Sequence, residues 1–239
     1  TSAFKAVDTF GNPNLNPESA FSYNIGAIFE EGGFYASADI YSFDFSDPVI
    51  VEDHNPIVNA AVQALATATT DDDAILSRIQ FNDPNAPSAS TISRIETNII
   101  NGPDIETSGI DFRVENTWFG MPNGGEFTLG GEATYVFNYE VGDFLVEDRT
   151  ITGGDVVGQF NRSNFLRSLP QWKANLFANY NFEAPWGNNN VRAVLRHVDS
   201  YDDERGDITP LNGQDDSEID SQTTVDLFYT TEVGENLNF

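Results

Sequence analysis

The 239-residue chain contains no cysteine, which excludes disulfide bonds, thiolate metal sites and cysteine nucleophiles. Its two histidines, His54 and His197, lie far apart and lack the spacing of metal ligands. Basic residues are also scarce, because 11 Lys and Arg oppose 38 Asp and Glu, for a formal net charge of -27. A surface of that sign repels nucleic acid phosphates, so no nucleic acid partner is expected.

Long apolar runs are absent as well. No stretch of about 18 apolar residues offers a transmembrane helix, and closed β-barrels are the other structures that span lipid. Aromatic residues are numerous, with 19 Phe, 8 Tyr and 3 Trp, so a disordered acidic chain is excluded. The chain starts at Thr1 without a signal peptide and stops at Phe239 in what resembles a new strand. We therefore interpret it as a fragment.

Seven segments alternate apolar and polar residues with a period of two, the pattern of a β-strand with two different faces. In residues 127–141 the odd positions, through Tyr139, form the apolar face. Phe177 is an exception on an otherwise polar face. Phe43 and Phe45 fall on the face opposite to the other apolar residues of their segment. The predicted strands are 21–30, 34–45, 104–118, 127–141, 172–182, 189–199 and 221–231.

The connections between these strands alternate strictly in length. Alternate connections of a meander lie at the same end of the sheet, so one end carries tight turns and the other carries large loops. Outer-membrane barrels have this asymmetry, with short periplasmic turns and longer extracellular loops. The short turns are 31–33, 121–125, 185–188 and 232–235, and the long loops are 46–91, 142–167 and 200–220.

The first long loop, 46–91, has a pattern of its own. Residues 56–67 are rich in alanine with apolar residues at helical spacing, and residues 71–80 predict a second short helical segment. This pattern indicates a folded excursion within the loop and not a second domain. A shorter alternating run at 92–100 is predicted to extend the strand at 104–118 past a break.

The apolar faces favour lipid over a packed interior. Aromatic residues gather near strand ends, while strand centres carry alanine, glycine and aliphatic residues, and a packed core prefers large aliphatic side chains there. Trp and Tyr rings favour the headgroup layer of a bilayer. The candidates for lipid-facing aromatic girdles are Phe21, Tyr23, Phe29, Phe127, Tyr135, Phe137, Trp172, Tyr180 and Phe182.

The opposite faces carry charges and amides, which suit a hydrated lumen. These charges could guide a ligand or contact a plug, or they could pair with opposite charges on neighbouring strands. Strands with such a lining cannot seal a small barrel, and open sheet edges do not occur in lipid. Further strands are therefore expected outside this sequence. The lumen-facing candidates are Lys173, Arg192, Arg196, Arg113, Glu132 and Asp226.

Four stretches carry a resemblance to a known family. Residues 11–18 (GNPNLNPE) lead into residues 22–26 (SYNIG), and residues 34–41 (FYASADIY) follow. Residues 107–111 (TSGID) and 219–226 (IDSQTTVD) come later. In order and spacing these stretches resemble the barrel of TonB-dependent receptors, in which the first leads from an extracellular loop into a descending strand.

The resemblance implies an all-β, antiparallel up-and-down transmembrane β-barrel of about 22 strands. Residues 1–239 would supply about seven to eight of these strands, while the plug domain, the TonB box and the closing strands are not found here. Such a receptor lies in the bacterial cell outer membrane, surrounded by its lipid. It binds an extracellular small molecule, such as a siderophore, cobalamin or an oligosaccharide, and imports it with energy from the periplasmic TonB protein.

No catalytic or cofactor-binding residue is identified, because no nucleophile–base pair, phosphate loop or metal cluster is visible in the sequence. We therefore expect no enzyme activity. The acidic loop at 199–220 offers Asp202, Asp203 and Asp207 as metal candidates. It lacks the residue order of a calcium loop, so we interpret it as a solvated acidic loop.

Two other functions are kept beside the transporter. A passive porin or structural outer-membrane barrel shares every feature derived above and lacks only the plug. A secreted acidic β-sandwich that acts as a binding module predicts solubility without detergent and a compact apolar interior.

Overall fold

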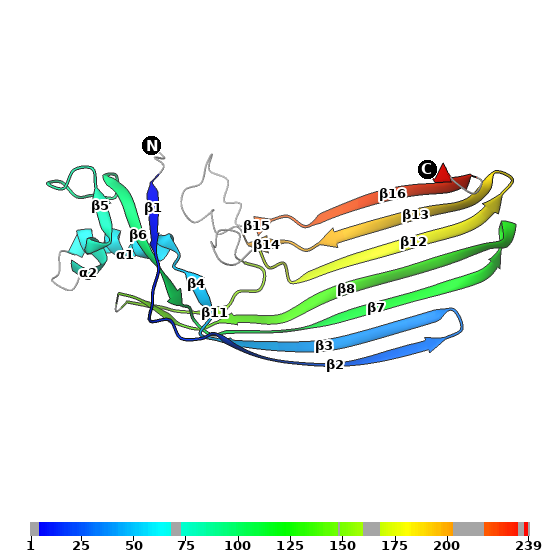
Figure 1. The fold of residues 1–239 in the computed structure, drawn as a ribbon, viewed down its shortest axis with the longest axis horizontal. Helices are drawn as coiled ribbons and strands as arrows, with labels where there is room; N and C mark the ends of the chain where they lie inside the picture. Colours follow the sequence, from blue (N-terminus) through cyan, green and yellow to red (C-terminus); the bar gives the residue numbers. More distant parts are fainter. Residues whose placement is uncertain are drawn as a thin grey trace.

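One antiparallel sheet makes up most of the chain in the computed structural model, which describes residues 5–67, 73–147, 149–159, 168–202, 218–233 and 237–238. The long strands neighbour each other in chain order and form a meander, while β11 (Gly154–Asp155) pairs with the carboxyl end of β8 (Figure 1). In spatial order the strands are β2 (Ser19–Glu31), β3 (Phe34–Ser46), β7 (Ile105–Met121), β8 (Gly125–Val141), β12 (Trp172–Ala184), β13 (Gly187–Val198), β16 (Gln222–Val233) and β17 (Leu237–Asn238).

All seven predicted strands are confirmed, with ends that differ by at most three residues from those expected. Their alternating pattern predicts strands because successive side chains of a strand point to opposite faces of the sheet. The segments 34–45 and 104–118, which are far apart in the sequence, pair as neighbours β3 and β7. The fold is thus a continuous antiparallel wall with one largely apolar and one largely polar face.

The two ends of the sheet differ as the connection lengths predicted. At one end, β2 and β3 are joined through Gly32, whose φ of 61° is a conformation that favours glycine. A short 3-10 helix, η2 (Pro122–Gly124), joins β7 and β8 at the same end. The long connections lie together at the other end (Figure 1). They include the short pairs β9 (Phe144–Val146) with β10 (Arg149–Ile151) and β14 (Tyr201–Asp202) with β15 (Glu218–Ile219).

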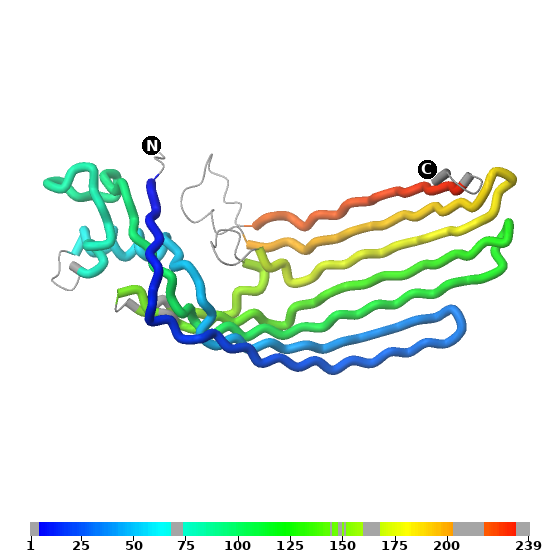
Figure 2. Tube along the Cα trace, in the orientation of Figure 1, coloured from blue at the N-terminus to red at the C-terminus, as the bar shows by residue number. Residues whose placement is uncertain are grey.

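The first long loop folds together with the flanking strand β6 and the distant strand β1 into a small unit, which we call the loop subdomain. Its central strand β6 pairs in parallel with β1 and antiparallel with β4 and β5. Figure 2 shows β1 running across the end of the long strands instead of beside them. The subdomain consists of β1 (Ala6–Phe10), β4 (Val49–Val51), α1 (His54–Thr67), α2 (Asp73–Ser77), β5 (Ile79–Phe81) and β6 (Ile92–Asn101).

Two expectations for this region need correction. The helix at 56–67 is confirmed as α1, but helix in 71–80 is limited to α2, and Ile79–Phe81 is a strand. The run at 92–100 is a strand, β6, but it does not extend the wall of the long sheet. All its partners are strands of the loop subdomain. The chain returns to the long sheet only after the break at residues 102–104, where β7 begins.

The main apolar core of the described residues lies in the loop subdomain. Ile57 and Ala61 of α1 are fully buried, and they pack with Ile75 of α2 and Ile95 of β6. Val146, from the second long loop, is 2% exposed and belongs to the same cluster. The side chain of Val146 therefore joins the first and second long loops into one packed body.

A buried ion pair holds the same region together. Arg78, between α2 and β5, donates hydrogen bonds to the carboxylate of Glu52, and only 8% and 7% of the two side chains are exposed. Arg78 also donates to Glu147 of the second loop at 3.2 Å and to the carbonyl oxygen of Glu96. The backbone N–H of Asn98 donates to Glu52 at 2.7 Å. These contacts satisfy charges that would be costly to bury alone.

The apolar face of the long sheet has no such interior. Ile25, Leu129, Leu176 and Trp172, from three different strands, are 71%, 49%, 56% and 36% exposed. In a soluble sandwich these side chains would pack against a second sheet. The sandwich alternative is therefore wrong for this chain. No helix among the described residues has the length and apolar character needed to cross a membrane.

Candidate functional site on the polar face of the sheet

Strand pairing sorts the charged side chains to one face, because residues directly opposite each other in neighbouring strands share a face. Arg113 on β7 lies opposite Glu132 on β8, and Glu132 lies opposite Asn175 on β12. Asn175 in turn lies opposite Arg196 on β13. All six charges expected in the lumen belong to this polar face: Arg113, Glu132, Lys173, Arg192, Arg196 and Asp226.

The aromatic candidates belong to the other, apolar face. Tyr135 lies opposite Trp172, and Phe127 lies opposite Tyr180. Phe137 lies at a bulge next to Tyr135, with ring centroids 5.9 Å apart. The predicted set therefore shares one face: Phe21, Tyr23, Phe29, Phe127, Tyr135, Phe137, Trp172, Tyr180 and Phe182.

Tyr139 was expected on the apolar face, and this expectation is wrong. The register of β8 against β7 shifts beside Phe137, so that Tyr139 lies opposite Thr107 on the polar face. A bulge of this kind inserts one extra residue and reverses the side-chain parity beyond it. With Tyr41 and Phe43, Tyr139 lines a hollow of about 770 Å³ on the polar face toward the long-loop end. Phe43 thus lies on the polar face, opposite Thr107, as its place in the sequence pattern predicted.

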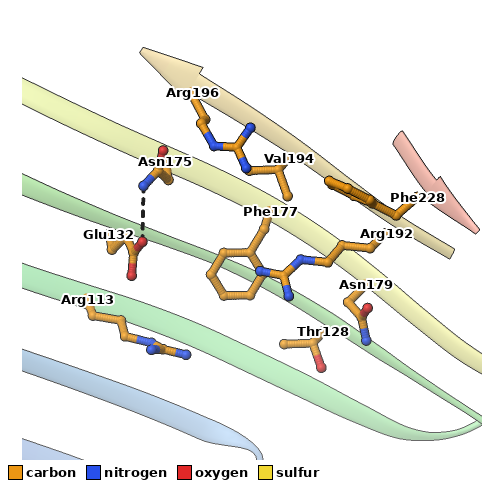
Figure 3. A pocket seen from close by; sticks show the side chains of 10 residues that line it. All are labelled: Arg113, Thr128, Glu132, Asn175, Phe177, Asn179, Arg192, Val194, Arg196 and Phe228. Carbon is orange, nitrogen blue, oxygen red and sulfur yellow. Dashed lines mark hydrogen bonds between the residues drawn. The ribbon is translucent and has the colours of Figure 1, made fainter. Parts of the chain in front are cut away.

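A second hollow, of about 590 Å³, lies over the middle of the polar face (Figure 3). Three arginines and a single glutamate contribute its charge, although acidic residues outnumber basic ones more than threefold in the whole chain. The hollow therefore concentrates positive charge in an acidic protein. Its lining residues are Arg113, Thr128, Glu132, Asn175, Phe177, Asn179, Arg192, Val194, Arg196 and Phe228.

Two of the arginines in the hollow have an acidic partner, and one of these pairs joins neighbouring strands, the kind of pairing that one of the two interpretations of these charges expects. Arg196 forms an ion pair with Asp226 on β16. Arg113 donates to Glu115 of its own strand at 2.6 Å. Charges of Arg196 and Arg113 are thus partly neutralised within the wall.

Phe177, the exception in the sequence pattern, occupies the centre of the hollow. The guanidinium carbons of Arg113 and Arg192 lie 5.9 and 5.4 Å from the centre of its ring. An arginine in this position is attracted by the electron-rich face of the ring, which orients its flat guanidinium group. The sequence carried a signal for this site, namely a large aromatic residue on a polar face, but no indication of its partners.

Gly130 makes room for the ring of Phe177. It lies directly opposite Phe177, and a Cβ atom at this position would come within 2.6 Å of Cζ of the ring and 2.7 Å of Cβ of Glu115. We expect Gly130→Ala to displace the ring and lower stability by about 1–3 kcal/mol, the range for overpacking. Thermal unfolding of the complete protein measures this. Gly11→Ala is the matched control, since a Cβ at Gly11 has no atom within 4 Å. Equal unfolding curves for the two variants would contradict the expected role of Gly130.

The metal candidates are only partly described. Asp202 lies in β14 and is exposed, while Asp203 and Asp207 lie outside the described residues. Within the described ranges, no group of three or more His, Cys, Asp and Glu side chains could hold a metal ion. The described part of the acidic loop thus adds no metal-binding geometry to the polar face.

Comparison with known proteins shows which family model and which solved structures this chain matches. Residues 3–239 match the family model described as TonB dependent receptor-like, beta-barrel. No curated protein sequence matches the chain.

Among solved structures, the chain is similar to a mutant of the ferric enterobactin receptor PfeA from Pseudomonas aeruginosa. The TM-score is 0.52 and the sequence identity is 12%, over 95% of this chain and 25% of that one. The ferric yersiniabactin uptake receptor FyuA from Yersinia pestis gives a TM-score of 0.47 and 12% identity, over 92% of this chain and 23% of that one. The chain thus spans about a quarter of the length of these structures.

Proposed function

Because the chain belongs to the TonB dependent receptor-like β-barrel family, we propose that it forms part of a barrel that imports an extracellular small molecule across the bacterial outer membrane. In this proposal the periplasmic TonB protein supplies the energy through a plug inside the barrel. The family is one of receptors and transporters and not of enzymes. Residues 1–239 would form part of the barrel domain, with the plug and the closing strands supplied by other parts of the protein.

One observation carries the proposal: a hollowed, charged face lies directly behind an apolar face whose side chains remain exposed. Leu227, Ile25 and Leu176 are 77%, 71% and 56% exposed on the apolar face. A wall with these two faces suits lipid on one side and water on the other. The six charged candidates would then line the lumen, and the nine aromatic candidates would face lipid near the membrane interfaces.

The orientation follows from the two ends of the sheet. Short periplasmic turns and long extracellular loops are typical of outer-membrane barrels. The end with Gly32 and η2 would therefore face the periplasm, and the loop subdomain would lie outside the cell. In that position a folded loop unit stands where a substrate first meets the receptor.

The proposed substrate is a small molecule such as a siderophore, cobalamin or an oligosaccharide. The names of the two similar structures refer to ferric enterobactin and ferric yersiniabactin. At 12% identity the likeness concerns only the fold. The proposed substrate class is therefore not restricted to ferric siderophores.

Uptake by cells that express the complete receptor tests the proposal. We expect radiolabelled ferric enterobactin, cobalamin or a maltooligosaccharide to enter only when TonB and the proton motive force are intact. Surface binding should persist after TonB is deleted, because binding precedes the energised step. Uptake of a labelled substrate at the same rate without TonB would instead favour the passive porin.

A further inference from the structure

The loop subdomain is built on a continuation of two wall strands. The last pair of β3 and β7 is Phe45 with Ile105, and the next pair beyond the break, between β4 and β6, is Val49 with Asn101. Both strands have the same number of residues between the two pairs, so the register passes from the wall into the subdomain without a shift. The four strands therefore form one bent, two-stranded ribbon.

Hydrogen bonds continue across the bend of this ribbon. The backbone N–H of Gly102 donates to the carbonyl oxygen of Pro48 at 2.7 Å, and that of Asp47 donates to the side chain of Asp104 at 3.2 Å. A Cβ atom on Gly102 would come within 2.6 Å of the Ile50 side chain, so the two strands are closely packed here. The bend thus has the pairing and packing of ordered strands.

Asn101 fastens a third segment to the ribbon. Its side-chain oxygen accepts a hydrogen bond from the backbone N–H of Asn16 at 2.8 Å. Its side-chain nitrogen donates to the carbonyl oxygens of Asn16 and Asp47 at 3.0 and 2.9 Å. One amide therefore joins the segment 11–18, which leads from β1 to β2, to both strands of the ribbon where the loop subdomain meets the long sheet (Figure 2).

Two more bonds tie neighbouring segments together at the same place. The backbone N–H of Val49 donates to the carboxylate of Glu18 at 3.2 Å. The backbone N–H of Gly142, where the second long loop leaves β8, donates to the carbonyl oxygen of Asp104 at 2.8 Å. Each segment that connects the long sheet to the first two long loops is thus bonded to another.

Proline stiffens the same connections. A hinge is a short segment whose φ and ψ angles absorb a large change, and the ring of proline fixes φ near about -65°. Three of the connecting segments, 11–18, 47–48 and 102–104, contain at least one proline: Pro13, Pro17, Pro48 and Pro103. Rotation of the loop subdomain against the wall would therefore have to break the hydrogen bonds of segments with little freedom of their own.

We infer that the loop subdomain is a fixed extension of the wall, locked at its base by Asn101, and does not swing over the end of the sheet as a hinged lid. The lock consists of the bent ribbon and the segment 11–18, which the Asn101 amide joins. This inference goes beyond the proposed import and holds whatever solute the barrel carries. Any element that closes over a substrate would lie elsewhere in the protein.

Distances between spin labels on the complete receptor test the inference. Asn59 on α1, Glu106 on β7 and Glu126 on β8 are exposed positions. Labels on Asn59→Cys and Glu106→Cys span the junction, whereas labels on Glu106→Cys and Glu126→Cys span the wall alone. We expect pulsed electron–electron double resonance to give one narrow distance peak of similar width for each pair. A broad peak or a second peak for the pair across the junction alone would overturn the inference.

A variant of Asn101 tests the lock itself. Asn101→Asp keeps an oxygen that can accept from Asn16 but removes the donors to Asn16 and Asp47. We expect a broader distance peak across the junction and an unchanged peak within the wall. Asn85→Ala is the matched control, because Asn85 is exposed in the connection between β5 and β6 and should leave both peaks unchanged. Equal peaks in Asn101→Asp and the wild type would overturn the role of Asn101.

Hydrogen–deuterium exchange tests the junction without labels or new cysteines. The amide of Gly102 should exchange about as slowly in the wild type as that of Glu52, which donates to the carbonyl oxygen of Asn98 inside the subdomain at 2.9 Å. In Asn101→Asp we expect exchange at Gly102 to be roughly threefold to tenfold faster, the factor for one net hydrogen bond. Exchange at Gly102 of the wild type as fast as in an unstructured peptide would overturn the inference.

Discussion

The complete receptor carrying Arg78→Ala is expected to lose the folded structure of its loop subdomain while its barrel remains intact. The substitution leaves the carboxylate of Glu52, which is 7% exposed, without the cation that compensates it. Removing one partner of a buried ion pair costs about 3–5 kcal/mol, a large fraction of what a small unit can supply. Hydrogen–deuterium exchange of peptides from residues 52–98 measures the loss as faster exchange, with unchanged exchange in β12 and β13.

Two variants show whether the buried charge is responsible. Arg94→Ala removes an arginine that pairs with Asp8 at 2.6 Å on the surface, with 43% and 36% of the side chains exposed. The bond to Asp8 raises the pKa of Arg94, but water screens the pair, so we expect little change in exchange. The double variant Arg78→Met with Glu52→Leu removes both charges and should retain protection better than Arg78→Ala. Unchanged exchange in Arg78→Ala would refute the structural role of the ion pair.

The result for Arg78→Ala also indicates whether the first and second long loops move as one unit. Arg78 joins Glu52 of the first loop to Glu147 of the second, and Val146 is buried beside α1 and β6. Two loops that share a core and an ion pair cannot move independently. If the loop subdomain changes position when a substrate binds, we expect β9 and the helices α1 and α2 to move together.

The strands of the long sheet could be predicted because their signal is local. A face in contact with one solvent and a face in contact with another impose a period of two on each segment, and short turns between them preserve the order. The charged candidates and the aromatic candidates lie on two different faces of the sheet for the same reason, while the lumen and the lipid remain the proposed surroundings of these faces. Tyr139 was misplaced because a one-residue bulge beside Phe137 leaves no trace in the pattern.

The loop subdomain and the central hollow depend on contacts that are distant in the sequence. Ala6 of β1 pairs in parallel with Arg94 of β6, and no local pattern predicts such a partner. The burial of Arg78 likewise depends on Glu52 and Glu147, which come from other segments. Phe177 could be noticed as an anomaly, but its position between two guanidinium groups requires the register of three strand pairs.

Replacing Leu176 with arginine is expected to destabilise the complete receptor in a bilayer by about 2–4 kcal/mol, if the apolar face meets lipid as proposed. Leu176 lies in the interior of β12 and is 56% exposed on that face, between Gly131 and Leu195. In water an exposed leucine tolerates such a change within about 0.5 kcal/mol. The size of the loss of stability therefore shows whether the apolar face meets lipid or water. Reversible unfolding of the receptor in lipid vesicles with guanidinium chloride provides the measurement.

Asn175→Arg is the control, because it places the same side chain one residue away on the opposite face. There the new guanidinium lies next to Glu132, which accepts a hydrogen bond from Asn175 at 3.1 Å, and water inside the barrel can solvate it. We expect a much smaller loss of stability than for Leu176→Arg. Adjacent residues of one strand share backbone, depth and neighbours, so a large difference between them can arise only from the face to which each side chain points. Two similar losses would mean that the apolar face does not meet lipid, and the proposed arrangement of the barrel wall would have to be abandoned.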